Sequence, residues 1–366
     1  MIPAARWLVV ALLAIGVASP PTLLRLWPAG DSSISATALA SRIDRSAALG
    51  WSGEVRSTGS LEVPLTGSTF GGVARLLGER SDLRVWWRDA EHYRVDRIRT
   101  SGEQDLVREG DRTVRWSYES GTATFTPYSP VRLPDDADVV PSALAKRLLA
   151  GARAGELSRL PSRRVAGRDA AGLRLVPADD RSTISRVEVW ADQETGLPLR
   201  VDAYAAGNAR RPVLTTEAIS FDPGRPAAST TSYSLAGGIK LRRAYALDEA
   251  AGANAFAPFA LPDRVADLPR RGRPEDFKAV GVYGRGPVAV LGVPLRGSVA
   301  RGLRDQLRQS AASREQGDTV ALEVGPLSVL LVYAGDRGGL LLTGTVTPAT
   351  LQTAAEDLVA GLVRTR

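Results

Sequence analysis

The chain has 366 residues, of which 44% are hydrophobic, and a formal net charge of +7. This length allows two domains, and this composition excludes wholesale disorder. Because there is no cysteine and the only histidine is His92, the chain has no disulfide framework, no thiolate metal site and little material for a serine–histidine–aspartate triad. The arginines are spread among acidic residues instead of clustering, which disfavours nucleic-acid binding and favours a membrane surface or an acidic partner.

The N-terminal segment, residues 1–28, has the layout of a secretory signal. Arg6 precedes an apolar run from Trp7 to Ser19, and Pro20 ends this run. The run is shorter than the about 20 residues that a membrane-spanning helix needs. The segment therefore predicts export to the periplasm or another extracytoplasmic compartment, with a cleaved signal peptide and a retained N-terminal membrane anchor as the two alternatives.

The first predicted element is a helix over residues 35–49, because Leu39, Ile43 and Ala47 share one face and Ser35 can cap the start. From Trp51 to about residue 222 the pattern changes to an apolar–polar alternation of period two, which is typical of strands. The predicted strands are interrupted by a helix at 141–150 and cover residues 51–60, 73–78, 83–88, 92–99, 105–109, 113–118, 123–126, 162–165, 173–177, 184–191, 197–204 and 213–221. The short connections predict antiparallel pairing of neighbouring strands.

A linker and a second domain follow. Residues 223–272 are rich in proline, glycine and alanine and predict a linker with one short strand at 239–244. Regular patterns return with predicted strands at 277–283, 288–293, 319–324, 327–333 and 340–344, and with helices at 298–311 and from Pro348 onwards. The predicted fold class is mostly β with an α+β part: a large antiparallel sheet domain, residues 32–222, and a small C-terminal α+β domain, residues 273–366.

Alternate positions of the large domain separate an apolar face from a charged face. A curved antiparallel sheet with only two helical segments can leave an apolar interior that suits acyl chains, although such a face can also be plain core. The residues that we select as ligand-binding on this apolar face are Val85, Trp87, Val95, Trp116, Tyr118, Phe125, Val189 and Leu199. Trp86 and Trp190 fall on the charged face and have no assigned role.

No catalytic residues, cofactor site or metal site are predicted. The acidic run Asp135–Asp138 could bind a cation weakly, but no further ligand residues follow it, so a plain loop is favoured. The glycine-rich segment Gly281–Gly286 lies between two predicted strands and is not followed by a helix, so it predicts a hairpin turn and not a nucleotide loop. The chain is therefore expected not to be an enzyme.

Three passages carry a family resemblance. The first runs from Trp87 to Tyr118, the second is the hairpin Val189–Arg200 with its Gly-Leu-Pro turn, and the third combines Tyr283–Val293 with Leu342–Thr350 in the small domain. Together they resemble the MucB/RseB-type sigma-E factor regulatory proteins, whose large domain has the fold of the lipoprotein carrier LolA.

This resemblance implies a LolA-like antiparallel half-barrel closed by helices, followed by a linker and a small α+β domain. It further implies a non-enzymatic, exported regulator of envelope stress signalling that binds lipid or lipoprotein in the half-barrel and a membrane-bound anti-sigma factor. Two alternatives stay open. A lipid or lipoprotein carrier of the cell envelope would need only the half-barrel, and an envelope structural or adhesion module would have neither a ligand nor a signalling partner.

Overall fold

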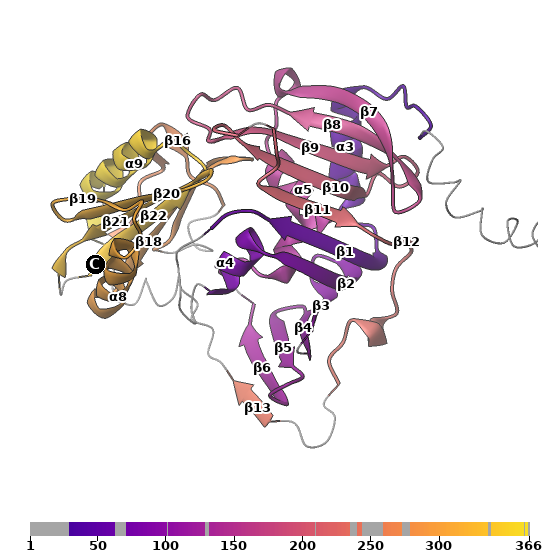
Figure 1. The fold of residues 1–366 in the computed structure, drawn as a ribbon, viewed down its shortest axis with the longest axis horizontal. Helices are drawn as coiled ribbons and strands as arrows, with labels where there is room; N and C mark the ends of the chain where they lie inside the picture. Colours follow the sequence, from indigo (N-terminus) through magenta and orange to yellow (C-terminus); the bar gives the residue numbers. More distant parts are fainter. Residues whose placement is uncertain are drawn as a thin grey trace, which may run out of the picture.

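The computed structural model describes residues 29–62, 71–100, 102–128, 132–208, 210–234, 240–243, 259–272, 279–335, 338–361 and 363–364. Two main sheets of unequal size dominate these residues (Figure 1). The predicted signal or anchor, residues 1–28, lies outside the described part of the chain. Among the described residues, no helix combines the length and the apolar character that crossing a membrane requires.

The large sheet follows the strand order β13-β6-β5-β4-β3-β2-β1-β11-β10-β9-β8-β7, and β12 also pairs with β1. Its strands are β1 (Trp51–Gly59), β2 (Arg80–Asp89), β3 (His92–Arg99), β4 (Gly102–Glu109), β5 (Arg112–Ser117), β6 (Thr122–Pro127), β7 (Leu157–Val165), β8 (Arg168–Leu175), β9 (Ile184–Asp192), β10 (Pro198–Ala205), β11 (Leu214–Ala218), β12 (Asp222–Pro223) and β13 (Lys240–Arg243). Two antiparallel meanders, β1–β6 and β7–β11, join where β1 pairs with β11. Within the described residues the two ends of this order do not pair, so the half-barrel prediction is confirmed.

Helices cover one face of this sheet. They are α3 (Ala36–Ser46) and α5 (Pro141–Leu149), together with the short 3₁₀ helices η1 (Asp136–Val139) and η2 (Ala154–Glu156) near the ends of α5. The two predicted helices are confirmed: Ser35 Oγ accepts a hydrogen bond from the Ala38 amide at 3.2 Å, and Pro141 lies in the first turn of α5.

One predicted strand, residues 73–78, is wrong. This segment is the helix α4 (Gly71–Gly78), in which the adjacent residues Leu76 and Leu77 pack into different apolar clusters. A short apolar run fits either a helix or a strand, so only its tertiary contacts decide the conformation. The end of α4 is held against the segment that follows β1 by the hydrogen bond from the Leu61 amide to the Leu77 carbonyl, at 2.9 Å.

The predicted linker is partly ordered against the large sheet. Residues 222–234 include β12 and the 3₁₀ helix η3 (Ala228–Thr230), and the predicted short strand is present as β13, which pairs in parallel with β6. Two short strand pairs lie beside the second sheet in the chain: β15 (Arg264–Val265) pairs with β16 (Leu268–Pro269) before it, and β14 (Phe259–Ala260) pairs with β23 (Val363–Arg364), which follows it. The rest of the predicted linker lies outside the described residues.

The small sheet has the order β17-β18-β22-β21-β20-β19. Adjacent residues on β21, Leu330 and Leu331, point to opposite faces and join different apolar clusters, one packed by α9 and the other by α8. The helices therefore cover opposite faces of this sheet, as Figure 1 also shows. The elements are β17 (Gly281–Arg285), β18 (Val288–Leu295), α8 (Gly297–Arg308), β19 (Arg314–Gln316), β20 (Thr319–Val324), β21 (Leu327–Tyr333), β22 (Gly339–Gly344) and α9 (Pro348–Gly361).

Candidate ligand and partner sites

The inner face of the large sheet, defined here as the face that α3, α5 and η1 cover, carries two adjoining apolar clusters. One cluster joins Val189 and Val201 to Leu39 of α3 and Leu144 of α5. The other contains Val85, Trp87 and Val95 together with Leu83, Leu106, Ala137 and Val140. Four of the eight predicted ligand-binding residues, Val85, Trp87, Val95 and Val189, are therefore on this face, and all four are buried.

Trp87 and Tyr93 form the aromatic part of the inner face. Their rings are stacked, with centroids 4.6 Å apart and planes inclined by 2°. Tyr93 is buried near the acidic residues of η1, and burial raises the pKa of its phenol, so this hydroxyl stays neutral. The stacked rings pack beside aliphatic side chains, so this part of the inner face is a continuous apolar surface under η1.

Arginines pair with the acidic residues of η1, and one of them, Arg97 of β3, links it to the sheet. Arg97 Nη1 donates to Asp136 Oδ1 at 3.2 Å, and Arg132 pairs with Asp135 at 3.0 Å and with Asp138 at 2.7 Å. The pKa of Asp135 is raised to about 6 by burial and by the neighbouring Asp138. The predicted loop at Asp135–Asp138 is thus wrong: it is a buried, ion-paired helical turn, because arginines neutralise its acidic side chains.

The other predicted ligand-binding residues do not join this face. Val95 lies opposite Leu106, whereas Arg94 lies opposite Val107, and Val107 in turn lies opposite Val114. This register puts Trp116 and Phe125 on the outer face, where they pack with Val107 and Tyr233. The shared face predicted for Trp116, Tyr118 and Phe125 is therefore wrong. Tyr233, from the predicted linker, packs on this outer apolar side and covers part of it.

Tyr118 and Leu199 depart from the prediction in different ways. Tyr118 follows β5, meets the ring of Trp116 edge-on, and is 69% exposed. Leu199 is buried but packs with Trp190 and Ala170 in a separate cluster. A β-bulge between Pro198 and Arg200 interrupts the alternation of β10, so parity along the strand misplaces Leu199.

Trp190, which had no assigned role, is a core residue of the outer side of the sheet. It is 2% exposed, its indole Nε1 donates to the Pro161 carbonyl at 3.2 Å, and the guanidinium of Arg163 lies 4.0 Å from its ring centroid. These contacts explain how a large aromatic residue fits among charged neighbours. We therefore assign it to stability and not to ligand binding.

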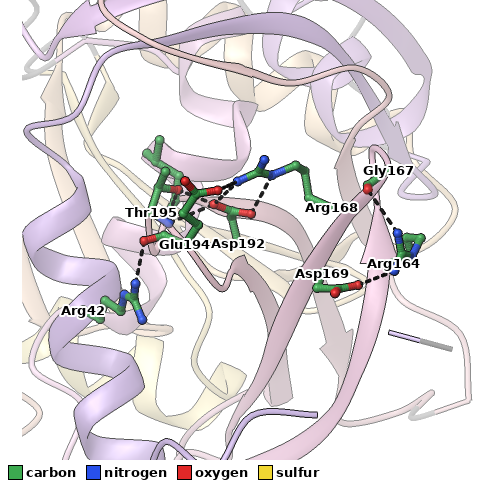
Figure 2. A network of polar contacts seen from close by, with 9 residues as sticks. Arg42, Arg164, Gly167, Arg168, Asp169, Asp192, Glu194 and Thr195 are labelled. Atoms are coloured by element: carbon green, nitrogen blue, oxygen red, sulfur yellow. Dashed lines mark hydrogen bonds and ion pairs between the residues drawn. The ribbon is translucent and has the colours of Figure 1, made fainter. Parts of the chain in front are cut away.

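The helix α3 is fixed to the sheet by a polar network (Figure 2). Arg42 donates to the Glu194 carbonyl at 2.5 Å, and Arg168 pairs with Asp192 at 2.9 Å and also with Glu194. Asp192 further accepts hydrogen bonds from the amide and the hydroxyl of Thr195, both at 2.8 Å, and these bonds lower its pKa together with Arg168. The network ties α3 to the β9–β10 turn, so this helix is a fixed cover of the inner face.

Three acidic side chains gather on the outer face of β3 and β4. One oxygen of each of Asp96, Glu103 and Asp105 lies within 4.8 Å of the others. Arg94 donates to Asp96 at 2.7 Å and to Asp105 at 2.8 Å, so a guanidinium already occupies the position that a cation would take. Burial and the neighbouring Asp96 raise the pKa of Asp105 to about 7. We assign no metal to this cluster.

A cleft of about 850 Å³ lies between the two sheets. Its apolar walls include Leu61, which follows β1, and Leu322 and Val324 of β20, while Glu62 and Glu323 add negative charge. Sequence reasoning missed this cleft, because residues about 260 positions apart form it only when the sheets meet. No local pattern around Leu61 signals it.

Part of the large domain matches a known protein family. Residues 98–222 match the family model described as the MucB/RseB N-terminal domain. These residues run from the end of β3 to the start of β12, and so include η1, α5 and the second meander. The resemblance found in the sequence is thereby confirmed over this part of the chain. A search of the curated proteins finds no match.

The chain also matches solved structures at low sequence identity. The MucA/MucB complex of Pseudomonas aeruginosa has 17% sequence identity and a TM-score of 0.47, with 87% of this chain and 96% of that chain covered. A LolA superfamily protein from Nitrosomonas europaea has 13% identity and a TM-score of 0.25, with 55% and 99% covered. A conserved protein from Thermus thermophilus has 10% identity and a TM-score of 0.36, with 57% and 99% covered.

Proposed function

We propose that this chain is a non-enzymatic, exported regulatory protein of the cell envelope. In this proposal the large domain, 32–222, binds an acyl lipid or the acyl chains of a lipoprotein, and the small domain, 273–366, contributes the contact with a membrane-bound anti-sigma factor. The match of residues 98–222 to the MucB/RseB N-terminal domain supports the regulatory role. MucB itself has been crystallised in complex with MucA(peri), and the partner that we propose for this chain is of the same kind.

One observation carries the lipid part of this proposal. The inner face is apolar across both adjoining clusters, yet its cover consists of α3, α5 and η1 and not of a second sheet. A short helix can move away as a unit because its backbone hydrogen bonds are internal, whereas a paired strand cannot leave without breaking its ladder. Val85, Trp87, Val95 and Val189 are the residues that an acyl chain would contact once α5 or η1 moved aside.

The cleft between the sheets supports the partner part. Its volume of about 850 Å³ and its apolar walls suit an extended peptide segment, and Glu62 and Glu323 favour a segment with basic residues. A contact in this cleft would involve both domains. This arrangement explains why a regulator needs the second domain, which a simple carrier would lack.

Fluorescence quenching tests the lipid site and the face assignment together. A lysophospholipid with a brominated acyl chain quenches tryptophans that it touches, and Trp87 faces inwards whereas Trp116 faces outwards. We expect quenching of the wild-type protein, a smaller quenched fraction in Trp87→Phe, and a somewhat larger fraction in Trp116→Phe, because that variant loses only unquenched emission. Equal quenching in all three proteins would refute the inner-face site.

An affinity capture tests the partner. Residues 29–366 are used as bait with detergent-solubilised membranes, and captured proteins and lipids are identified by mass spectrometry. Recovery of a single-span protein with a cytoplasmic sigma-factor-binding domain, lost in the bait variant Glu323→Arg, whose side chain is exposed in the cleft, supports the proposal. Recovery of lipids or lipoproteins alone favours the carrier, and recovery of neither favours a structural or adhesion module.

A further inference from the structure

The two ends of the cover over the inner face are held by different parts of the molecule. Helix α3 is tied to the β9–β10 turn of its own sheet through Arg42 and the Asp192 network. Helix α5 ends instead beside the hairpin turn that joins β17 to β18, in the small sheet. The two helices that cover the inner face are therefore contacted by different sheets.

Arg285 makes the central contact at this junction. Its Nη1 donates to Glu156 Oε2 at 2.8 Å and to the Gly151 carbonyl at 3.1 Å, and its Nη2 donates to Glu156 Oε1 at 2.6 Å. Gly151 lies two residues after the last residue of α5, so the guanidinium meets the carbonyl end of the helix, where a cation is favoured. The fork geometry matches the carboxylate with two parallel hydrogen bonds.

Glu156 is buried and is held in position by backbone hydrogen bonds beside this cation. Its side chain is 2% exposed, and its two oxygens also accept hydrogen bonds from the backbone amides of Arg153, at 2.8 Å, and Ala178, at 3.0 Å. Arg285 and these amides lower the pKa of Glu156 to about 2. The carboxylate therefore stays ionised at physiological pH, so the contact does not respond to pH in that range.

The hairpin turn also fits closely against the end of α5. Gly286 has a φ of +47°, and a Cβ atom at this position would lie 2.8 Å from the Leu148 carbonyl oxygen and 3.2 Å from that of Ala150. Arg271 supports the turn, with its Nη2 donating to the Gly286 carbonyl at 3.2 Å. Only glycine permits so close an approach of two backbones here.

Other contacts hold the two sheets together independently of this junction. The amide of Thr183 donates to the Thr345 carbonyl at 3.1 Å, the amide of Thr347 donates to the Arg181 carbonyl at 2.9 Å, and Thr183 Oγ1 donates to the Pro326 carbonyl at 2.6 Å. Loss of the Arg285 contact would therefore free the end of α5 without separating the domains. The junction is local to α5.

We propose that the β17–β18 turn, residues 284–287, is a latch that holds α5 over the inner face, with Arg285 as its positioning residue. When the turn sits on the carbonyl end of α5, the helix is kept against β10 and β11, and withdrawal of the turn lets the C-terminal half of α5 lift. Combined with the proposed lipid site, on which this part rests, the latch couples the two domains: a partner that displaces the turn opens the inner face. By linkage, a lipid that lifts α5 must release the turn by the same factor.

Hydrogen–deuterium exchange of the full chain tests the latch without any ligand. In Arg285→Ala, the amides of residues 145–149 should exchange roughly tenfold faster than in the wild type, while those of β9 keep their rate. Arg314→Ala is the matched control, because it removes an exposed ion pair, with Glu323, that lies within the small domain. The latch is overturned if α5 exchange in Arg285→Ala equals that in Arg314→Ala, or if β9 exchange rises as much as α5 exchange.

A glycine pair tests the same contact by steric means. Gly286→Ala places a methyl group against the Leu148 carbonyl, whereas Gly317→Ala has a similar positive φ of +59° but meets no atom within 4 Å. Gly286→Ala should accelerate α5 exchange as Arg285→Ala does, and Gly317→Ala should not; equal effects of the two would contradict the latch. A protein with fast α5 exchange in these variants but no lipid binding would refute the proposed lipid site and leave the latch intact.

Discussion

Removing the side chain of Leu144 tests whether α5 is an integral cover of the inner face. Leu144 is 8% exposed and packs in the cluster that also contains Val189 and Val201. Leu144→Ala deletes three carbon atoms, which at about 0.8 kcal/mol each amounts to about 2.4 kcal/mol of lost burial. A cavity contribution adds to this value, but a short helix can shift to fill part of the space, so we expect about 2.5–3 kcal/mol.

Urea unfolding followed by tryptophan fluorescence measures this change. Within residues 29–366 every tryptophan lies between Trp51 and Trp190, so the signal reports the large sheet and not the small one. The same loss should lower the melting temperature of this domain by about 5–10 °C. The matched control is Leu49→Ala, which makes the same chemical change at a side chain that is 42% exposed and should cost under about 1 kcal/mol.

The difference in unfolding free energy between the two leucine variants shows whether α5 is packed into the apolar clusters. If Leu144→Ala cost no more than Leu49→Ala, α5 would not be packed into the apolar clusters, and the argument that a helix covers the inner face would fail. A large loss with an unchanged denaturant slope would support the packing, because the surface exposed on unfolding would be unaltered.

Three further predictions concern the sheet itself. Because the folded-state pKa of Asp105 is raised to about 7, the ionised form is disfavoured in the native state, and the free energy of unfolding falls as pH rises from about 4 through about 7. The stability advantage of Asp105→Asn over the wild type should therefore be larger at pH 8 than at pH 5. An equal difference at both pH values in urea titrations would contradict this. Trp190→Ala should cost about 3–5 kcal/mol by circular dichroism, since it empties a fully buried site and strips Arg163 of its stacking surface; a cost under about 1 kcal/mol would refute the core role. Gly59→Ala places a Cβ atom 2.1 Å from the Leu77 carbonyl oxygen and should destabilise the contact with α4 by about 1–3 kcal/mol, whereas Gly207→Ala, which meets no atom within 4 Å, should be close to neutral in the same assay.

Much of the fold was readable from the chain alone. The alternation from Trp51 onwards predicted the strands and their antiparallel meanders, because side chains of a strand point to opposite faces whatever surrounds them. Ser35 and Pro141 marked the starts of α3 and α5 through local capping and backbone preferences. In each case the signal lies within a few neighbouring residues.

The candidate site depended on information that no single strand carries. Alternation separates the two faces of one strand but does not say which face continues into the next, so Trp116 and Phe125 were grouped with Val95 although the register turns them outwards. One inserted residue in β10 moved Leu199 in the same way. The short apolar run at 73–78 is a helix, with Leu76 and Leu77 in two different clusters, because a run of this length fits either conformation and its tertiary contacts decide between them.

Sequence by itself thus determined most element types, with the helix α4 as an exception, together with the meander order and the apolar character of the large sheet, since these depend on local periodicity and turns. Only the tertiary structure decided which face is covered by helices, which aromatic residues line it, and that Arg285 reaches the end of α5 from a distant hairpin. The physical reason is that register and domain contacts are set by pairings between segments far apart in the chain, and such pairings leave no periodic trace in either segment.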